Sequence, residues 1–213
     1  DISVAGYGSR AISAVAENEI LITSTGDLTT GSTYGAGIFA TSNAGGVTVY
    51  STGNIATKGN GGFGISAFTS KGGVFIVSDG DIDIGGAADG INGYSADGNV
   101  TVVARGAITT IQNSSSGVEV EAKNGEAIVA LAGPFNADIH TSGKNSDGIS
   151  IEASALAAAS VRDVIADGLD SDGVSIKAGT SVARVQVQGD VHGGWGDAIC
   201  IRVWDWSETS QTV

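Results

Sequence analysis

Aliphatic residues recur along the chain about every 26 residues, and this period is the main signal in the sequence. The steps between them are 26, 27, 26, 27, 31, 25 and 25 residues, and the positions are Ile12, Ile38, Ile65, Ile91, Val118, Ile149, Val174 and Ile199. Each follows a small residue and most begin a short alternating run, as in 149–151 and 174–176. Alternation with period two predicts one short β-strand in each repeat.

Two further apolar runs follow within the repeats. The second covers 20–22, 47–49, 74–76, 100–102 and, more weakly, 183–185. The third is marked by Leu28, Ile55, Ile82, Ile108, Ile139, Ile165 and Val191. The turn between these two runs carries a glycine, expected to adopt positive φ, at Gly26, Gly53, Gly80, Gly106 and Gly189. Three strands per repeat predict an all-β protein, a right-handed parallel β-helix that is a three-stranded solenoid of about eight coils.

The repeat also predicts the domain organisation. One β-helix domain is expected over residues 1–201, and residues 202–213, with Trp204 and Trp206, leave the pattern and are expected to form a C-terminal cap or a disordered tail. Residues 131–136 hold the only proline and predict a bulge or protruding loop, whereas the alanine-rich 153–159 is kept as a weak strand. The first residues do not resemble a signal peptide, so we expect an excerpt of a longer protein.

Composition agrees with a thin core and excludes several functions. Thirty-four glycines, one proline and no methionine suit a narrow lumen filled by Ala, Val and Ile. The net charge of -13 repels phosphate groups, so nucleic-acid binding is not expected. No apolar run approaches the ~20 residues of a spanning helix, so no membrane insertion by this chain is expected. Cys200 is alone and has no partner for an internal disulfide.

The second run carries the strongest candidate for binding. Its outward positions form two columns across successive repeats, namely Leu21, Thr48, Phe75, Thr101, Ile128 and Thr23, Tyr50, Val77, Val103, Ala130. Apolar side chains that point outward on adjacent coils make a contiguous exposed patch, which often marks a contact surface. We therefore predict Tyr50, Phe75, Val77 and Val103 as binding residues. The open alternatives are that a loop or another part of the protein covers this stripe, or that the inward and outward positions are reversed.

The third run suggests a catalytic alternative. Asp81 and Asp83 point to the same face, and paired carboxylates serve acid and base roles in enzymes that act on polysaccharides. No lysine or arginine stands beside them on this face, so a solvated acidic face is the favoured interpretation. We therefore predict no catalytic residues and no enzyme, with a polysaccharide lyase or hydrolase as the alternative.

Metal and cofactor motifs are weak. His140 and His192, with Asp138 and Asp190, stand two coils apart and do not predict a shared metal. Acidic turn residues could bind Ca²⁺ weakly, but Asp-Gly is also a favourable turn pair, and these residues are Asp147, Asp167, Asp170 and Asp172. The glycine-rich segment 59–64 matches a dinucleotide fingerprint in spacing but lies in a turn. We predict no metal and no cofactor.

The repeat unit resembles a known family. The segment from Gly37-Ile38-Phe39-Ala40 through Gly46-Val47-Thr48-Val49 to Gly53-Asn54-Ile55 resembles the passenger domains of Gram-negative autotransporters, over nearly all of residues 2–201. The resemblance implies export across the outer membrane, followed by an extracellular or cell-surface location. It further implies an adhesin, a self-association module or a receptor-binding structural module. The expected partners are a host receptor, a matrix protein, a glycan or a second copy of the chain.

Overall fold

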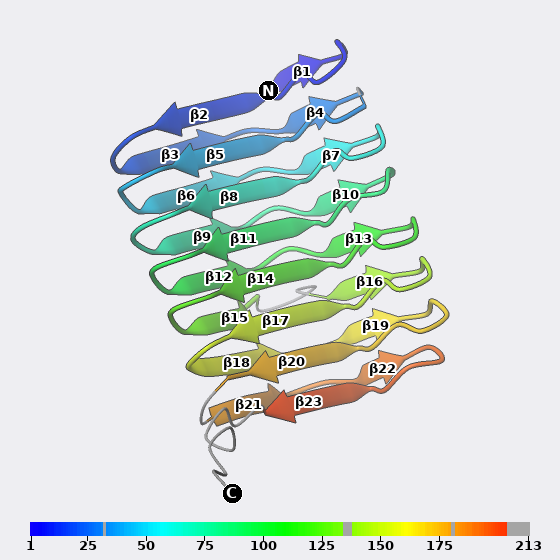
Figure 1. The fold of residues 1–213 in the computed structure, drawn as a ribbon. Helices are drawn as coiled ribbons and strands as arrows, with labels where there is room; N and C mark the ends of the chain where they lie inside the picture. Colours follow the sequence, from blue (N-terminus) through cyan, green and yellow to red (C-terminus); the bar gives the residue numbers. More distant parts are fainter. Residues whose placement is uncertain (32, 134–137, 180–181, 204–213) are drawn as a thin grey trace, which may run out of the picture.

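The chain folds into a parallel β-helix. The computed structural model describes residues 1–31, 33–133, 138–179 and 182–203, and in these ranges it contains β-strands and no helix. Successive strands wind around three faces, so that each face is a parallel sheet and the turns stack into a rod (Figure 1). The twenty-three strands, at three per turn, make seven full turns with two strands over, close to the eight coils expected. No described helix is long and apolar enough to cross a membrane.

Each strand pairs only with the equivalent strand of the turns next to it. Sheet A contains β1 (Ile2–Val4), β4 (Leu28–Thr30), β7 (Ile55–Thr57), β10 (Ile82–Ile84), β13 (Ile108–Thr110), β16 (Ile139–Thr141), β19 (Val164–Ala166) and β22 (Val191–Gly193). Sheet B contains β2 (Ile12–Ala16), β5 (Ile38–Ser42), β8 (Ile65–Thr69), β11 (Ile91–Ser95), β14 (Val118–Ala122), β17 (Ile149–Ala153), β20 (Val174–Ala178) and β23 (Ile199–Val203). Sheet C contains β3 (Ile20–Thr25), β6 (Val47–Thr52), β9 (Val74–Ser78), β12 (Val100–Ala104), β15 (Ala127–Leu131), β18 (Leu156–Val161) and β21 (Val182–Val187).

Six of the eight recurring aliphatic residues lie in the core, as the sequence predicts, whereas Ile12 is half-buried and Ile199 is 39% exposed on the first and last strands of sheet B. All eight landmarks begin a strand of sheet B, and Ile38, Ile65 and Ile91 stack in direct register with no exposed surface. The backbone N–H of Ile38 donates to the carbonyl of Gly64 at 2.9 Å, and the other turns repeat this bond. Burying an isoleucine side chain contributes roughly 1.5–3 kcal/mol, so each ladder couples neighbouring turns through the lumen.

One predicted core position is wrong. Ile165 was expected to point inward, but Val164 takes that place, pairing with Ile139 and Val191 and having no exposed surface. Ile165 faces outward and is 38% exposed. The turn before β19 lacks the glycine of the other repeats, so it is one residue shorter and the alternation begins on Val164.

The turn glycines are required for two different reasons. Gly26 and Gly53 have φ of 105° and 116°, as expected. Gly80 does not have positive φ, which corrects the prediction, and the same holds for Gly106 and Gly189. A Cβ at Gly80 would instead collide with the backbone carbonyl of Gly53 in the preceding turn. Close stacking of one turn on the next therefore excludes a side chain there.

Aspartate and asparagine side chains link successive turns at the corner before sheet A. The backbone N–H of Asn54 donates to Asp27 Oδ1 at 2.7 Å, and that of Asp81 donates to Asn54 Oδ1 at 3.0 Å. Ala107 continues the series by donating to Asp81 Oδ1 at 2.8 Å. We name Asp27, Asn54 and Asp81 the A-corner ladder. It satisfies backbone donors where the chain turns and the sheet pairing is interrupted.

A second series occupies the corner before sheet B. Backbone N–H groups of Ser116, Asp172 and Asp197 each donate, at 2.8 Å, to a carboxylate one turn earlier. The acceptors are Asp89, Asp147 and Asp172, which we name the B-corner ladder.

The segments expected to depart from the regular repeat are 131–136, 153–159 and the end of the chain. The weak strand expected in 153–159 is present as β18 (Leu156–Val161). Of the predicted loop at 131–136, Leu131 ends β15, and residues 134–136 lie outside the described residues. β23 continues to Val203, two residues past the expected end of the repeats, and the expected cap or tail at 204–213 also lies outside the described residues.

Candidate functional site

The four predicted binding residues lie on the outer face of sheet C. Tyr50 is in β6, Phe75 and Val77 are in β9, and Val103 is in β12. Tyr50, Val77 and Val103 are directly paired across the three strands, and Phe75 belongs to the neighbouring outward column. The outward register read from the sequence is therefore confirmed. The structure brings all four residues onto adjacent rungs of one sheet.

Only part of this group is accessible to a partner. Tyr50 and Phe75 are 42% and 36% exposed, and their rings meet edge to face with centroids 6.0 Å apart. Leu21, in the same column as Phe75, is 69% exposed. Val77 is only 8% exposed, which corrects its prediction as an open contact residue. Among the four predicted residues, Tyr50 and Phe75 are therefore the most accessible, and Leu21 adds to the apolar surface of this face.

A shallow pocket opens beside the two aromatic rings. It has a volume of about 290 Å³, and its lining residues include Tyr50, Phe75 and Val77. Asp79 and Arg105 form its polar side, with Arg105 Nη1 2.6 Å from Asp79 Oδ1. An apolar surface bordered by an ion pair can give a partner both apolar contact area and hydrogen bonds that fix its orientation.

The acidic pair has a structural explanation for one member. Asp81 and Asp83 are both exposed on the outer side of sheet A, as expected. Asp81 belongs to the A-corner ladder and accepts the N–H of Ala107. In the described part of the chain no ion pair joins either carboxylate to a lysine or arginine. The geometry therefore accounts for Asp81 without catalysis.

The acidic turn residues each have a separate contact. Asp147 and Asp172 accept backbone N–H groups, as described for the B-corner ladder. Asp167 Oδ2 lies 2.9 Å from His140 Nε2, and Asp170 Oδ2 lies 3.7 Å from Lys144 Nζ. Among the described residues no group of three His, Cys, Asp or Glu side chains converges as a metal site would require.

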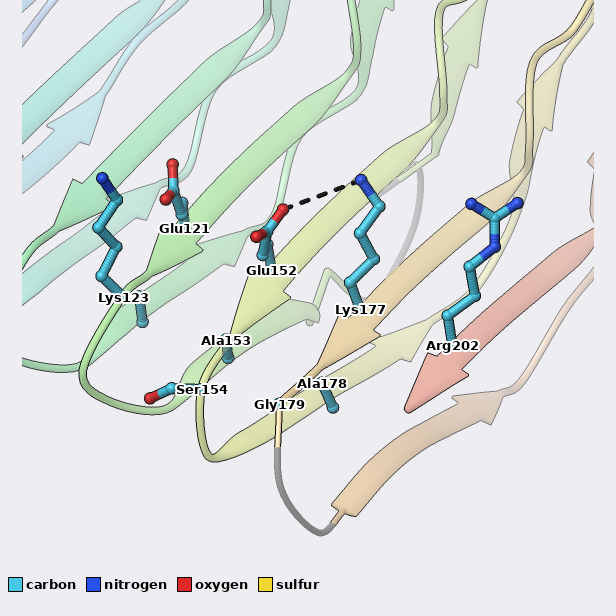
Figure 2. Close-up of a pocket in the computed structure, with 10 residues that line it drawn as sticks. Glu121, Lys123, Glu152, Ala153, Ser154, Lys177, Ala178, Gly179 and Arg202 are labelled. Carbon is cyan, nitrogen blue, oxygen red and sulfur yellow. Dashed lines mark ion pairs between the residues drawn. The ribbon is translucent and has the colours of Figure 1, made fainter. Parts of the chain in front are cut away.

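A larger pocket lies at the edge of sheet B, and the sequence analysis missed it. Its volume is about 640 Å³, and charged side chains from successive turns line it (Figure 2). These side chains are Glu121, Lys123, Glu152, Lys177 and Arg202. All of these except Lys123 stand three residues after the recurring aliphatic residue of their repeat. Listing the outward positions of the first strand as a column would therefore have found this group in the sequence.

Local contacts hold two of the pocket's lysines. Lys177 Nζ is 3.8 Å from Glu152 Oε2, a surface ion pair in water. Lys123 Nζ lies 5.5 Å from the ring centroid of Tyr94. A hydrogen bond to Tyr94 and the nearby charge of Glu121 raise the pKa of Lys123. Lys123 is therefore cationic at neutral pH.

One carboxyl group is buried beside another acid. Asp89 is 6% exposed, accepts the N–H of Ser116 at 2.8 Å, and lies 3.2 Å from Asn92 Nδ2. Burial, together with the charge of Glu119 and a hydrogen bond to it, raises the pKa of Asp89 to about 7. Burial also raises the pKa of Asp147 in the same ladder. Asp89 is thus partly protonated near neutral pH.

Comparison with known proteins identifies no relative: no family model, curated protein or solved structure matches this chain.

Proposed function

We propose that this chain is a secreted or surface-displayed β-helix of the autotransporter passenger type that binds a partner side-on through sheet C. The observation that carries the proposal is the exposed pair of Tyr50 and Phe75 on adjacent rungs of a stacked sheet. Exposed aromatic residues at the centre of a contact surface commonly supply most of its binding energy. The partner classes proposed are a matrix protein, a glycan or another cell-surface receptor.

The fold supplies the rigidity that such a contact needs. Tyr50 and Phe75 project from strands paired on both sides, so their positions are fixed before binding. A partner that binds a preformed surface loses less conformational entropy than one that must order a loop. Leu21 extends the apolar surface toward the first turns, and the Asp79–Arg105 pair limits it on the polar side.

The test is an array of glycans and extracellular-matrix proteins probed with the purified chain. The double variant Tyr50→Ser/Phe75→Ser should weaken any saturable binding by at least about tenfold, as expected when hot-spot aromatics are lost. Its β-rich circular dichroism spectrum should not change, because both side chains point away from the lumen.

A matched control is available within the same chain. Tyr7 and Tyr34 form another exposed edge-to-face pair, with centroids 5.9 Å apart, away from sheet C. Tyr7→Ser/Tyr34→Ser should leave array binding unchanged. Equal binding by the sheet C variant and the wild type would reject the proposed contact face. If the wild-type chain binds nothing on the array, the binding function is rejected for these partner classes.

A further inference from the structure

Four charged side chains stand in a single row on sheet B. Glu121, Glu152, Lys177 and Arg202 come from β14, β17, β20 and β23 and are paired directly from one strand to the next. Figure 2 shows them projecting side by side from successive turns. The order along the rod is two acids followed by two bases. We name these four residues the charge row.

The charge row is paired at its centre and open at its two ends. Its one internal ion pair, Glu152 to Lys177, is 3.8 Å long, and both side chains are about half exposed, at 60% and 45%. In the described part of the chain, neither Glu121 nor Arg202 has an ion pair of its own. Arg202 is exposed and Glu121 is half-buried. These charges are therefore available to a partner.

The order of charges in the row is self-complementary. A two-fold axis along the strand direction, passing between β17 and β20, reverses the rod and sets the row against itself. Glu121 then faces Arg202 of the second copy, and Glu152 faces Lys177 of the second copy. All four contacts of such an isologous interface join opposite charges. We propose that two chains associate antiparallel, side by side, through the charge row.

The same pattern disfavours the neighbouring arrangements. With parallel rods in register, each charge of the row would face its own kind. An antiparallel slip by one turn would set either Glu152 or Lys177 against its own copy. Each slipped arrangement keeps two opposite-charge contacts and adds one like-charge contact, whereas the unslipped antiparallel arrangement has four opposite-charge contacts and no like-charge contact. The row therefore favours this orientation and register.

The surface next to the row permits close approach. The neighbouring outward column on β17 and β20 holds Ser150 and Ser175, which are paired with each other and half-buried. In the proposed arrangement Ser150 lies opposite Ser175 of the second copy. The net charge of -13 repels the two chains elsewhere, so attraction is concentrated at the row.

The test combines charge reversal with rescue, followed by sedimentation equilibrium of the full chain. Lys177→Glu and Glu152→Lys should each lower the association constant by at least about tenfold, since each sets like charges opposite each other twice. The double variant Glu152→Lys/Lys177→Glu restores opposite charges and should return association to the wild-type level. Lys71→Glu makes the same charge change as Lys177→Glu at an exposed position outside the row and should have no comparable effect.

A cross-link checks the register. In a Cys200→Ser background, a mixture of the Ser150→Cys and Ser175→Cys chains should form a disulfide dimer, whereas either chain alone should not. A wild-type chain that stays monomeric, a double reversal that fails to restore association, or equal cross-linking by one variant alone would overturn the proposal. The variant Tyr50→Ser/Phe75→Ser should associate normally, so failure here is distinguishable from failure of the sheet C contact.

Discussion

The substitution Asp89→Asn should make the β-helix more stable at neutral and alkaline pH. The buried carboxyl group of Asp89 accepts the N–H of Ser116 and contacts Glu119, so ionisation places two negative charges together. In Asp89→Asn the amide oxygen can keep the bond from Ser116, and the amide N–H₂ can donate to Glu119 as the proton does in the wild type. The bond from Asn92 loses its acceptor, which costs about 1 kcal/mol.

The magnitude follows from the shift in the pKa of Asp89. The pKa of Asp89 is 3.8 in the unfolded chain and about 7 in the folded chain. Between these two pH values the folded chain holds a proton that the unfolded chain has released, so the free energy of unfolding falls as pH rises. Each pKa unit is worth about 1.4 kcal/mol, so the wild type should lose roughly 2–3 kcal/mol from this group between about pH 5 and 8. Above about pH 8 the contribution is constant.

The assay is denaturant unfolding of the wild type and Asp89→Asn at a series of pH values from about 5 to 8, above the sequence pI of 4.2. The stability difference between the two chains should grow in favour of the variant by about 2 kcal/mol across the series. Comparing the two chains cancels the contribution of Asp147, whose pKa is also raised. Asp81→Asn, in the A-corner ladder, controls for the loss of one carboxylate. A difference that does not change with pH would refute the reasoning.

Changes at two further positions, Asp81 and Gly80, test the corners and the catalytic alternative. Asp81→Ala should lower the free energy of unfolding by about 0.5–1 kcal/mol, because Ala107 loses its acceptor, whereas Asp81→Asn keeps an acceptor and should unfold at the wild-type denaturant midpoint. Asp81→Asn can therefore be assayed on a uronic-acid polymer, where loss of a wild-type activity would support the enzyme alternative and contradict a purely structural Asp81. Gly80→Ala should destabilise the chain by more than about 1 kcal/mol in the same unfolding assay, since its Cβ would collide with the carbonyl of Gly53. An unchanged midpoint would show that the turns can separate there without cost.

Much of the fold could be predicted because one physical requirement repeats. Each turn must place aliphatic side chains in the same lumen, so Ile38, Ile65 and Ile91 recur at nearly constant spacing and fix the register of sheet B. The same alternation identified Tyr50 and Phe75 as outward-facing. The prediction was wrong where a turn changed length, as at Ile165, because a one-residue change exchanges inward and outward positions.

Other features depend on distances between turns that spacing alone does not reveal. The burial of Val77 and the close approach at Gly80 both depend on how tightly neighbouring rungs pack. The charge row could have been read from the sequence as a column of outward positions. It is not conspicuous there, because its residues are far apart in the sequence and each stands between inward-facing residues. Asp89 was not distinguished from other Asp-Gly turns, because its burial beside Glu119 is set by the adjacent turn.

The glycine that precedes six of the eight strands of sheet B makes the length of the rod adjustable. Gly64 precedes Ile65, and Gly90 precedes Ile91, in equivalent positions one turn apart. Removing residues 65–90 would therefore join Gly64 to Ile91 and recreate the same local sequence, shortening the rod by one strand spacing of about 4.8 Å. Gain or loss of whole turns gives such a chain a route to vary its reach and to exchange surface residues while the lumen remains filled.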